Sequence, residues 1–237
     1  MYGGYYGYGY YWDPTYFLVL VGLVLCLGAS ALVNSTMRKY SKVRNMRGLT
    51  GAEAARNILN REGLYNVQIE CLNSDDGDHY DPRTDTVRLS YNNFNGTSVT
   101  AVSVAAHECG HAVQHARAYA PLTMRSKLVP VVSFTSNIMT WVLLGGILML
   151  NTFPQLLLAG IILFAMTTLF SFITLPVEIN ASKRALVWLS SSGITNARNH
   201  TQAEDALRSA AYTYVVAALG SLATLVYYIM IFMGRRE

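Results

Sequence analysis

The sequence predicts a mainly α-helical membrane protein with about four transmembrane helices and a smaller polar α+β part. Hydrophobic residues make up 52% of the 237 residues, and charged residues make up only 14%. Ordinary soluble domains carry about 25% charged residues. The charges are also unevenly placed, because long uncharged runs separate short charged segments. Both observations indicate several membrane spans with a modest polar part between them.

The composition excludes three other classes of protein. Intrinsically disordered chains are rich in charge and poor in apolar residues, so this chain is not one of them. Three cysteines are too few, and odd in number, for a secreted disulfide scaffold. The net charge of +4 is small and the basic residues flank apolar runs, so we expect no nucleic-acid partner.

The first span is expected within residues 16–33. No charged residue stands between Asp13 and Arg38, and the core of this gap is the apolar run Tyr16–Val33. Eighteen or more apolar residues are enough to cross a bilayer as a helix. The preceding tail, residues 1–15, is rich in Tyr and Gly, and its aromatic side chains are expected to lie at the membrane–water interface.

The next two spans are expected as a hairpin in residues 128–177. This fifty-residue run contains no charged residue and no histidine. One helix of that length would measure about 75 Å, against a hydrocarbon core of about 30 Å. Pro154 supplies a break, so we expect helices over Val131–Leu150 and Gln155–Leu175. A fourth helix is expected in residues 209–234, the last uncharged gap.

The distribution of Lys and Arg predicts the orientation. Five basic residues follow the first span, three precede the second and two follow the third, whereas the tail has none. By the positive-inside rule, residues 34–127 and 178–208 face the cytoplasm. The polar region 34–127 is expected to form a helix over Thr50–Gly63, strands at Val67–Cys71 and Thr86–Ser90, and a helix over Ser98–Tyr119. Residues 75–85 between the strands are rich in turn formers.

The chemistry is concentrated in His107-Glu108-Cys109-Gly110-His111, an HExxH motif. Residues four apart share one face of a helix, so His107 and His111 can bind one zinc ion together. Glu108 lies about 100° round the helix, where it can take a proton from a water activated by the ion. The motif stands in an alanine-rich apolar helix, where a carboxylate without a partner such as a metal would be costly.

Catalytic zinc usually has three protein ligands, so the motif needs one more. A third histidine ten residues after His107 would complete one known pattern, but that position is Arg117. His115 lies about 12 Å along the helix axis from His107, too far to share one ion. Glu178 ends the long uncharged run, on the same membrane side as His107, and is expected to open a helix there. We expect Glu178 as the third ligand, with Glu204 and Asp205 as competing carboxylates.

Beyond the first span, nearly the whole chain resembles the bacterial membrane neutral zinc metallopeptidases, the YugP-like family. The resemblance is carried by LTGAEAARNIL (49–59), DHYDPRTDTVRLS (78–90), VAAHECGHAVQHA (104–116), APLTMRSKLVP (120–130), PVEINASKRAL (176–186) and AAYTYVVAAL (210–219). It implies one zinc per chain bound by His107, His111 and Glu178, with Glu108 as general base. The cytoplasmic part would then be a zincin-like catalytic part of the HExxH/Glu gluzincin type, in a multi-pass protein of the bacterial cell membrane. Related HtpX-type proteases carry Asp where this chain has Ser182, so their contacts behind the ligands are not implied.

The resemblance implies a zinc endopeptidase that cuts membrane or membrane-near proteins on the cytoplasmic side. The alternative is a catalytically silent scaffold of the same fold, which would not need Glu108. An oxyanion donor is also required, with His79, Tyr80, His200, Tyr212 and Tyr214 as candidates. The edge of the strand Thr86–Ser90 could pair with an extended substrate, or could be plain sheet. The oligomeric state and any protein partner are left open.

Overall fold

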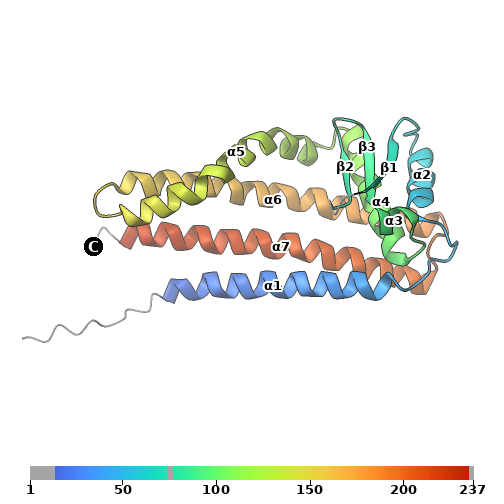
Figure 1. Ribbon diagram of the computed structural model, residues 1–237, viewed down its shortest axis with the longest axis horizontal. Coiled ribbons are helices and arrows are strands. Elements are labelled where there is room, and N and C mark those ends of the chain that lie inside the picture. Colours follow the sequence, from blue (N-terminus) through green and yellow to red (C-terminus); the bar gives the residue numbers. More distant parts are fainter. Residues whose placement is uncertain (1–13, 74–76, 235–237) are drawn as a thin grey trace, which may run out of the picture.

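The computed structural model describes residues 14–73 and 77–234, and shows four long helices with an α+β part at one end (Figure 1). Residues 1–13 of the Tyr/Gly-rich tail lie outside the described residues. The start of the first long helix and the end of the last lie at the opposite end from the α+β part (Figure 1). The mainly helical fold class with a small sheet is therefore confirmed.

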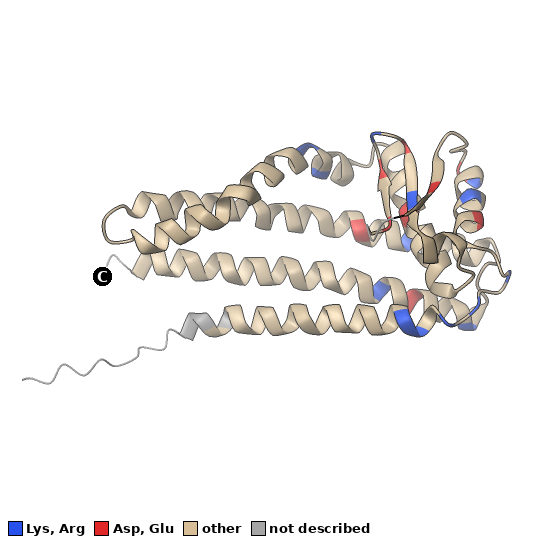
Figure 2. Ribbon diagram, in the orientation of Figure 1, with Lys and Arg blue, Asp and Glu red and all other residues tan. Residues whose placement is uncertain are grey.

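Within the described residues, four helices are long and apolar enough to cross a membrane. They are α1 (Pro14–Tyr40), α5 (Ala120–Leu148), α6 (Pro154–Ser191) and α7 (Ala197–Gly234). The charged residues gather toward the end that carries the α+β part, and the rest of each long helix is free of them (Figure 2). The structure therefore combines an apolar helical bundle with a polar part at one end of it.

Helices α5 and α6 form the predicted hairpin, but α6 is longer than expected. It continues without interruption through Pro176 to Ser191, so Glu178 lies inside a helix rather than at the start of one. Proline removes one backbone donor, but apolar surroundings penalise every other unpaired backbone group, so membrane helices often run through it. The segment that carries Glu178 is thus a continuous extension of a long apolar helix.

The polar part begins with the short helix α2 (Gly51–Arg61). Its capping box is formed as the sequence predicted: the Glu53 amide donates to Thr50 Oγ1 at 3.1 Å, and the Thr50 amide donates to the Glu53 carboxylate at 2.8 Å. Gly63 follows the helix with a positive φ of 78°, a conformation that glycine adopts without strain. Two more helices, α3 (Tyr91–Asn95) and α4 (Val99–Ala116), come after the sheet.

The sheet has three strands, one more than the sequence predicted. Its order is β1 (Gln68–Leu72), β3 (Thr86–Ser90) and β2 (His79–Asp81), with β3 parallel to β1 and antiparallel to β2. Part of the turn-rich stretch therefore forms β2, which returns into β3 as a hairpin. Because β3 lies in the centre with a partner on each side, Thr86–Ser90 is plain sheet, the second of the two alternatives that the sequence left open.

The core of the polar part is built around α4. Its buried side chains pack against α2, the sheet and the polar ends of α6 and α7. Alanine is frequent on both α4 and α6, and small residues let helix backbones approach closely. A Cβ on Gly110 would lie 2.9 Å from the Cα and the carbonyl oxygen of Ala181. Glycine at position 110 therefore allows α4 and α6 to pack in contact.

Candidate metal centre

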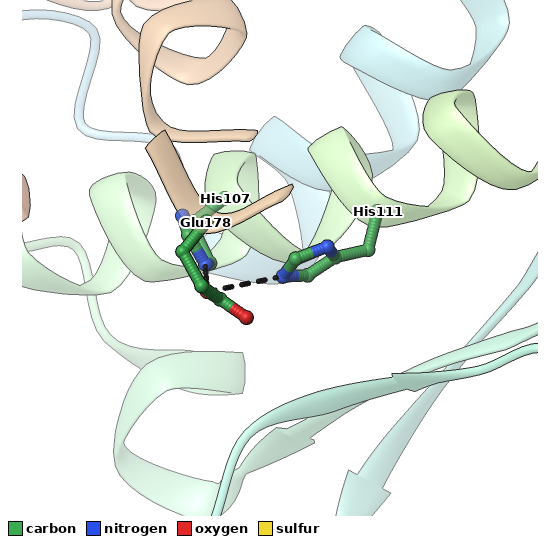
Figure 3. A group of neighbouring side chains, drawn as sticks. All are labelled: His107, His111 and Glu178. Atoms are coloured by element: carbon green, nitrogen blue, oxygen red, sulfur yellow. Dashed lines mark hydrogen bonds and ion pairs between the residues drawn. The ribbon is translucent and has the colours of Figure 1, made fainter. Parts of the chain in front are cut away.

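Two histidines on α4 and one glutamate on α6 converge on a single point (Figure 3). His107 Nε2 lies 3.2 Å and His111 Nε2 lies 3.6 Å from Oε2 of Glu178. One potential ligand atom from each residue lies within 4.8 Å of the other two. In the part of the chain that the structure describes, this is the one group of His, Cys, Asp or Glu side chains with such a geometry.

The convergence follows from the helix geometry. His107 and His111 are one turn apart on α4 and face the same side, so their rings stand 4.8 Å apart between centroids. The contact between Gly110 and Ala181 brings α6 against that side. Glu178 lies about one turn before Ala181, so its carboxylate reaches the two imidazoles from the facing helix.

The other nitrogen of each imidazole has its own partner. His107 Nδ1 lies 3.1 Å from Ser182 Oγ, and His111 Nδ1 lies 3.1 Å from Gln114 Oε1. The Gln114 amide nitrogen donates to the Val177 carbonyl at 2.8 Å, which fixes the amide so that its oxygen faces the ring. His111 therefore carries a proton on Nδ1. Metal-binding histidines commonly donate this second nitrogen to such a partner.

These contacts decide what the centre can hold. With Nδ1 of His111 protonated, a neutral ring presents a bare lone pair at Nε2, directly opposite a carboxylate oxygen of Glu178. Two such lone pairs repel each other unless a proton or a metal cation lies between them. Burial is the largest single influence and disfavours the imidazolium, but Glu178, Glu108 and Gln114 together outweigh it and raise the pKa of His111. Two imidazoles and a carboxylate form a donor set typical of zinc, so the residues present fit that ion.

Glu178 is 3% exposed and has one further charged neighbour. Nη1 of Arg125, in the first turns of α5, lies 3.3 Å from its second oxygen, Oε1. The carboxylate is thus divided between two roles, since Oε2 faces the histidines and Oε1 faces the guanidinium. A buried carboxylate needs such partners, because an unpaired buried charge is strongly unfavourable.

Glu108 lies next to the three converging groups, on the wall of a large cleft. It is 7% exposed, and burial raises the pKa of its carboxyl above the ordinary value, while the positive forms of His107 and His111 oppose that rise. The cleft has a volume of about 780 Å³ and runs between β2, the first turns of α5 and the face of α4. It is large enough for several residues of an extended chain.

The structure separates the five candidate oxyanion donors. His79, Tyr80 and Tyr214 line the large cleft together with the metal-site residues, whereas His200 and Tyr212 do not. The Tyr80 hydroxyl is already engaged, since it lies 2.5 Å from Asp85 Oδ1 and 2.8 Å from His115 Nδ1. Tyr214 of α7 also lines a second, smaller cavity beside Glu178.

The rejected alternatives for a third ligand have other partners. His115 contacts the Tyr80 hydroxyl, and Arg117 forms an ion pair with Glu62. Asp205 accepts a hydrogen bond of 2.8 Å from the Tyr40 hydroxyl, and Glu204 is exposed.

Three contributing residues were not identified from the sequence. Gln114 and Ser182 contact the histidines, and Arg125 contacts Glu178. The spacing of Gln114, three residues after His111, was the available signal, because such pairs share a helix face. Ser182, four residues after Glu178, offered a similar signal, whereas Arg125 offered none because its contact depends on how α5 and α6 pack.

The comparisons with known proteins show the family to which the chain belongs. The family model described as "Putative neutral zinc metallopeptidase" matches residues 15–233. The chain is also similar to the protein named "Putative membrane protease YugP" of Bacillus subtilis (strain 168), with 44% identity over 221 residues, which is 93% of this chain and 97% of the relative. No solved structure shows significant similarity to it. The chain therefore belongs to this family of zinc metallopeptidases, and the resemblance found in the sequence is confirmed.

Proposed function

We propose that this chain is an integral-membrane zinc endopeptidase in which His107, His111 and Glu178 hold one zinc ion and Glu108 is the general base. The observation that carries the proposal is the arrangement of the three ligand atoms, within 4.8 Å of one another and with His111 Nε2 facing Glu178 Oε2. This arrangement requires a proton or a metal cation between the facing atoms, and the donor set suits zinc. Three protein ligands leave one position open, which is typical of catalytic rather than structural zinc.

A zinc ion held there would supply Lewis acidity, lowering the pKa of a water toward about 7 and polarising a peptide carbonyl. Glu108 would accept the proton of the attacking water at its carboxylate and later donate it to the leaving amine. The raised pKa of Glu108 suits a group that must both take and return a proton. Tyr214 is the best placed of the oxyanion candidates, because it lines the site next to Glu178 and belongs to a rigid helix.

The membrane determines which substrates can reach the site. The lining of the large cleft includes charged residues such as Arg125 and Glu178 and also Val129 and Pro130 from the start of the long uncharged run. The cleft therefore lies where the charged end of the bundle meets its uncharged length; Figure 2 shows these two regions. We propose that the substrates are membrane or membrane-proximal proteins, and that the cleft faces the cytoplasm. The support for that side is the excess of Lys and Arg at this end of the bundle, which the positive-inside rule assigns to the cytoplasm.

The test separates metal binding from catalysis with two matched variants, purified as the full chain in detergent. Glu108→Gln removes the base and no ligand, so the protein should keep its zinc and lose cleavage of a casein substrate. His107→Ala removes a ligand, so it should lose both. A scaffold without activity would show no cleavage in the zinc-loaded wild type. Zinc loss in Glu108→Gln as large as in His107→Ala would contradict the assigned roles.

A further inference from the structure

A second cavity opens onto the metal centre from behind the large cleft. Its volume is about 180 Å³, and it lies between α1, α4, α6 and α7. It shares part of its wall with the large cleft, and the shared residues include the general base and two of the metal-binding residues. The shared residues are Asp78, His107, Glu108, Glu178 and Tyr214.

The far end of this cavity differs in chemistry from its mouth. The residues that line it but not the large cleft are uncharged, and all but one are apolar: Met37, Val104, Ser182, Leu207, Ala210 and Ala211. The exception, Ser182, has its hydroxyl 3.1 Å from His107 Nδ1. The space exists because α7 carries two alanines there, where larger side chains would fill it. The cavity is therefore polar where it meets the reacting groups and apolar where it ends.

We propose that this cavity is a specificity pocket, which takes one uncharged apolar side chain of the substrate beside the bond to be cut. The proposal rests on the proposed endopeptidase function. The extended substrate backbone occupies the large cleft, and the cavity behind Glu108 receives the side chain that points away from the cleft at the metal centre. The residues shared by the two linings, His107, Glu108 and Glu178 among them, are the groups proposed to carry out the reaction.

The size and polarity of the cavity select the side chain. An apolar protein cavity of about 150 Å³ holds a benzene ring, so about 180 Å³ accommodates the side chain of Leu, Met or Phe. A charged side chain is excluded, because the residues at the apolar end offer it no partner and burying an unpaired charge is costly. Gly or Ala would leave the space empty and lose the gain from apolar burial.

The experiment profiles cleavage sites with the zinc-loaded full chain in detergent. A tryptic digest of bacterial proteins serves as the peptide library, and mass spectrometry identifies the new termini. Leu, Met and Phe should be enriched at one of the two positions that flank the cut bond. Binding is measured separately, by fluorescence anisotropy of a labelled peptide from the profile on the Glu108→Gln protein, which should bind the Phe form more tightly than the Ala form.

Two variants change the pocket in opposite directions. Ala210→Leu fills it, so the ratio of kcat/KM for Phe over Ala at that position should fall by about tenfold or more, the discrimination expected from a few methylene groups. Leu207→Ala enlarges it, so the preference should move toward Trp. The control is Ala217→Leu, an exposed alanine on the same helix, which should keep the wild-type profile. All three should retain zinc.

The outcomes separate this proposal from the proposed function. Cleavage without an apolar preference, or a preference that neither Ala210→Leu nor Leu207→Ala alters, would overturn the specificity pocket and leave the endopeptidase intact. Complete absence of cleavage by the zinc-loaded wild type would contradict the endopeptidase itself, and the pocket would then have no substrate to select.

Discussion

Replacing Gln114 by Leu should weaken zinc binding without unfolding the protein. Gln114 is fully buried, and Leu is apolar and close to it in size. The Gln114 side-chain oxygen accepts from Nδ1 of His111 and so keeps the proton of that ring on Nδ1. The Gln114 amide nitrogen donates to the Val177 carbonyl and to Asn180 Oδ1. In the metal-free variant, His111 can carry its proton on Nε2 instead and donate it to Glu178. The metal-free protein therefore loses little stability.

The zinc-bound variant cannot move the His111 proton to Nε2 in this way. A metal on Nε2 of His111 keeps the proton on Nδ1, where it would be buried without an acceptor. An unsatisfied buried donor costs about 1–3 kcal/mol, which corresponds to about a 5- to 150-fold change in an equilibrium constant. That range agrees with the 10–100-fold loss typical when the second partner of a metal-binding histidine is removed. The penalty therefore falls almost entirely on the zinc-bound state.

The assay is a zinc titration of the detergent-solubilised protein against a competing chelator at pH 7. The matched control is Gln202→Leu on α7, since the buried Gln202 Oε1 accepts no hydrogen bond from any residue that the structure describes. This control should retain wild-type zinc affinity. An affinity within twofold of wild type in a correctly folded Gln114→Leu protein would refute the argument that Gln114 fixes the ring.

Three further changes test the packing, the sheet and the orientation. Gly110→Val places a Cβ 2.9 Å from the Ala181 Cα, so α4 and α6 must separate. Overpacking of this kind costs about 1–3 kcal/mol and should lower both the melting temperature and the zinc affinity. An unchanged melting temperature would contradict the close contact. The hydrogen bond from Arg88 holds the pKa of Asp81 well below its usual range. The stability that Asp81 contributes is therefore full above about pH 3.9, the pKa of Asp in the unfolded chain, and is lost as the pH falls through the lower pKa of the folded state. The melting temperature of Asp81→Asn should be below that of the wild type at pH 6, and the two should converge at low pH. A difference that stays constant with pH would count against this linkage. A cysteine at Asn95, in a chain without its native cysteines, should resist a membrane-impermeant thiol reagent in intact cells and react after permeabilisation; labelling in intact cells would place the cleft outside.

The parts of the fold set by local rules could be predicted from the sequence. Charge gaps located the four long helices, and the capping box at Thr50 marked the start of α2. The spacing of His107 and His111 placed both on one face of α4. Glu178 could be singled out because the hairpin returns the chain to the same membrane side, which is an argument from topology that needs no knowledge of packing.

The parts that depend on contacts between elements could not be predicted. Rules for soluble helices favour a break at Pro176, but an apolar environment favours continuous helix, so α6 runs on. The strand β2 has only three residues and pairs only because β3 lies beside it. The contact of Ser182 with His107 follows from the rotation of α6 against α4, which the sequence does not reveal.

The central claim is that Glu178 completes a zinc site with the two histidines. It is tested most directly by the zinc content of the purified chain, measured by mass spectrometry of the metal after gel filtration. The wild type and Glu204→Ala, which removes an exposed carboxylate, should each carry about one zinc per chain, since three ligands bind one ion. Glu178→Ala should carry little. Full zinc in Glu178→Ala, or loss of zinc in Glu204→Ala, would contradict the account.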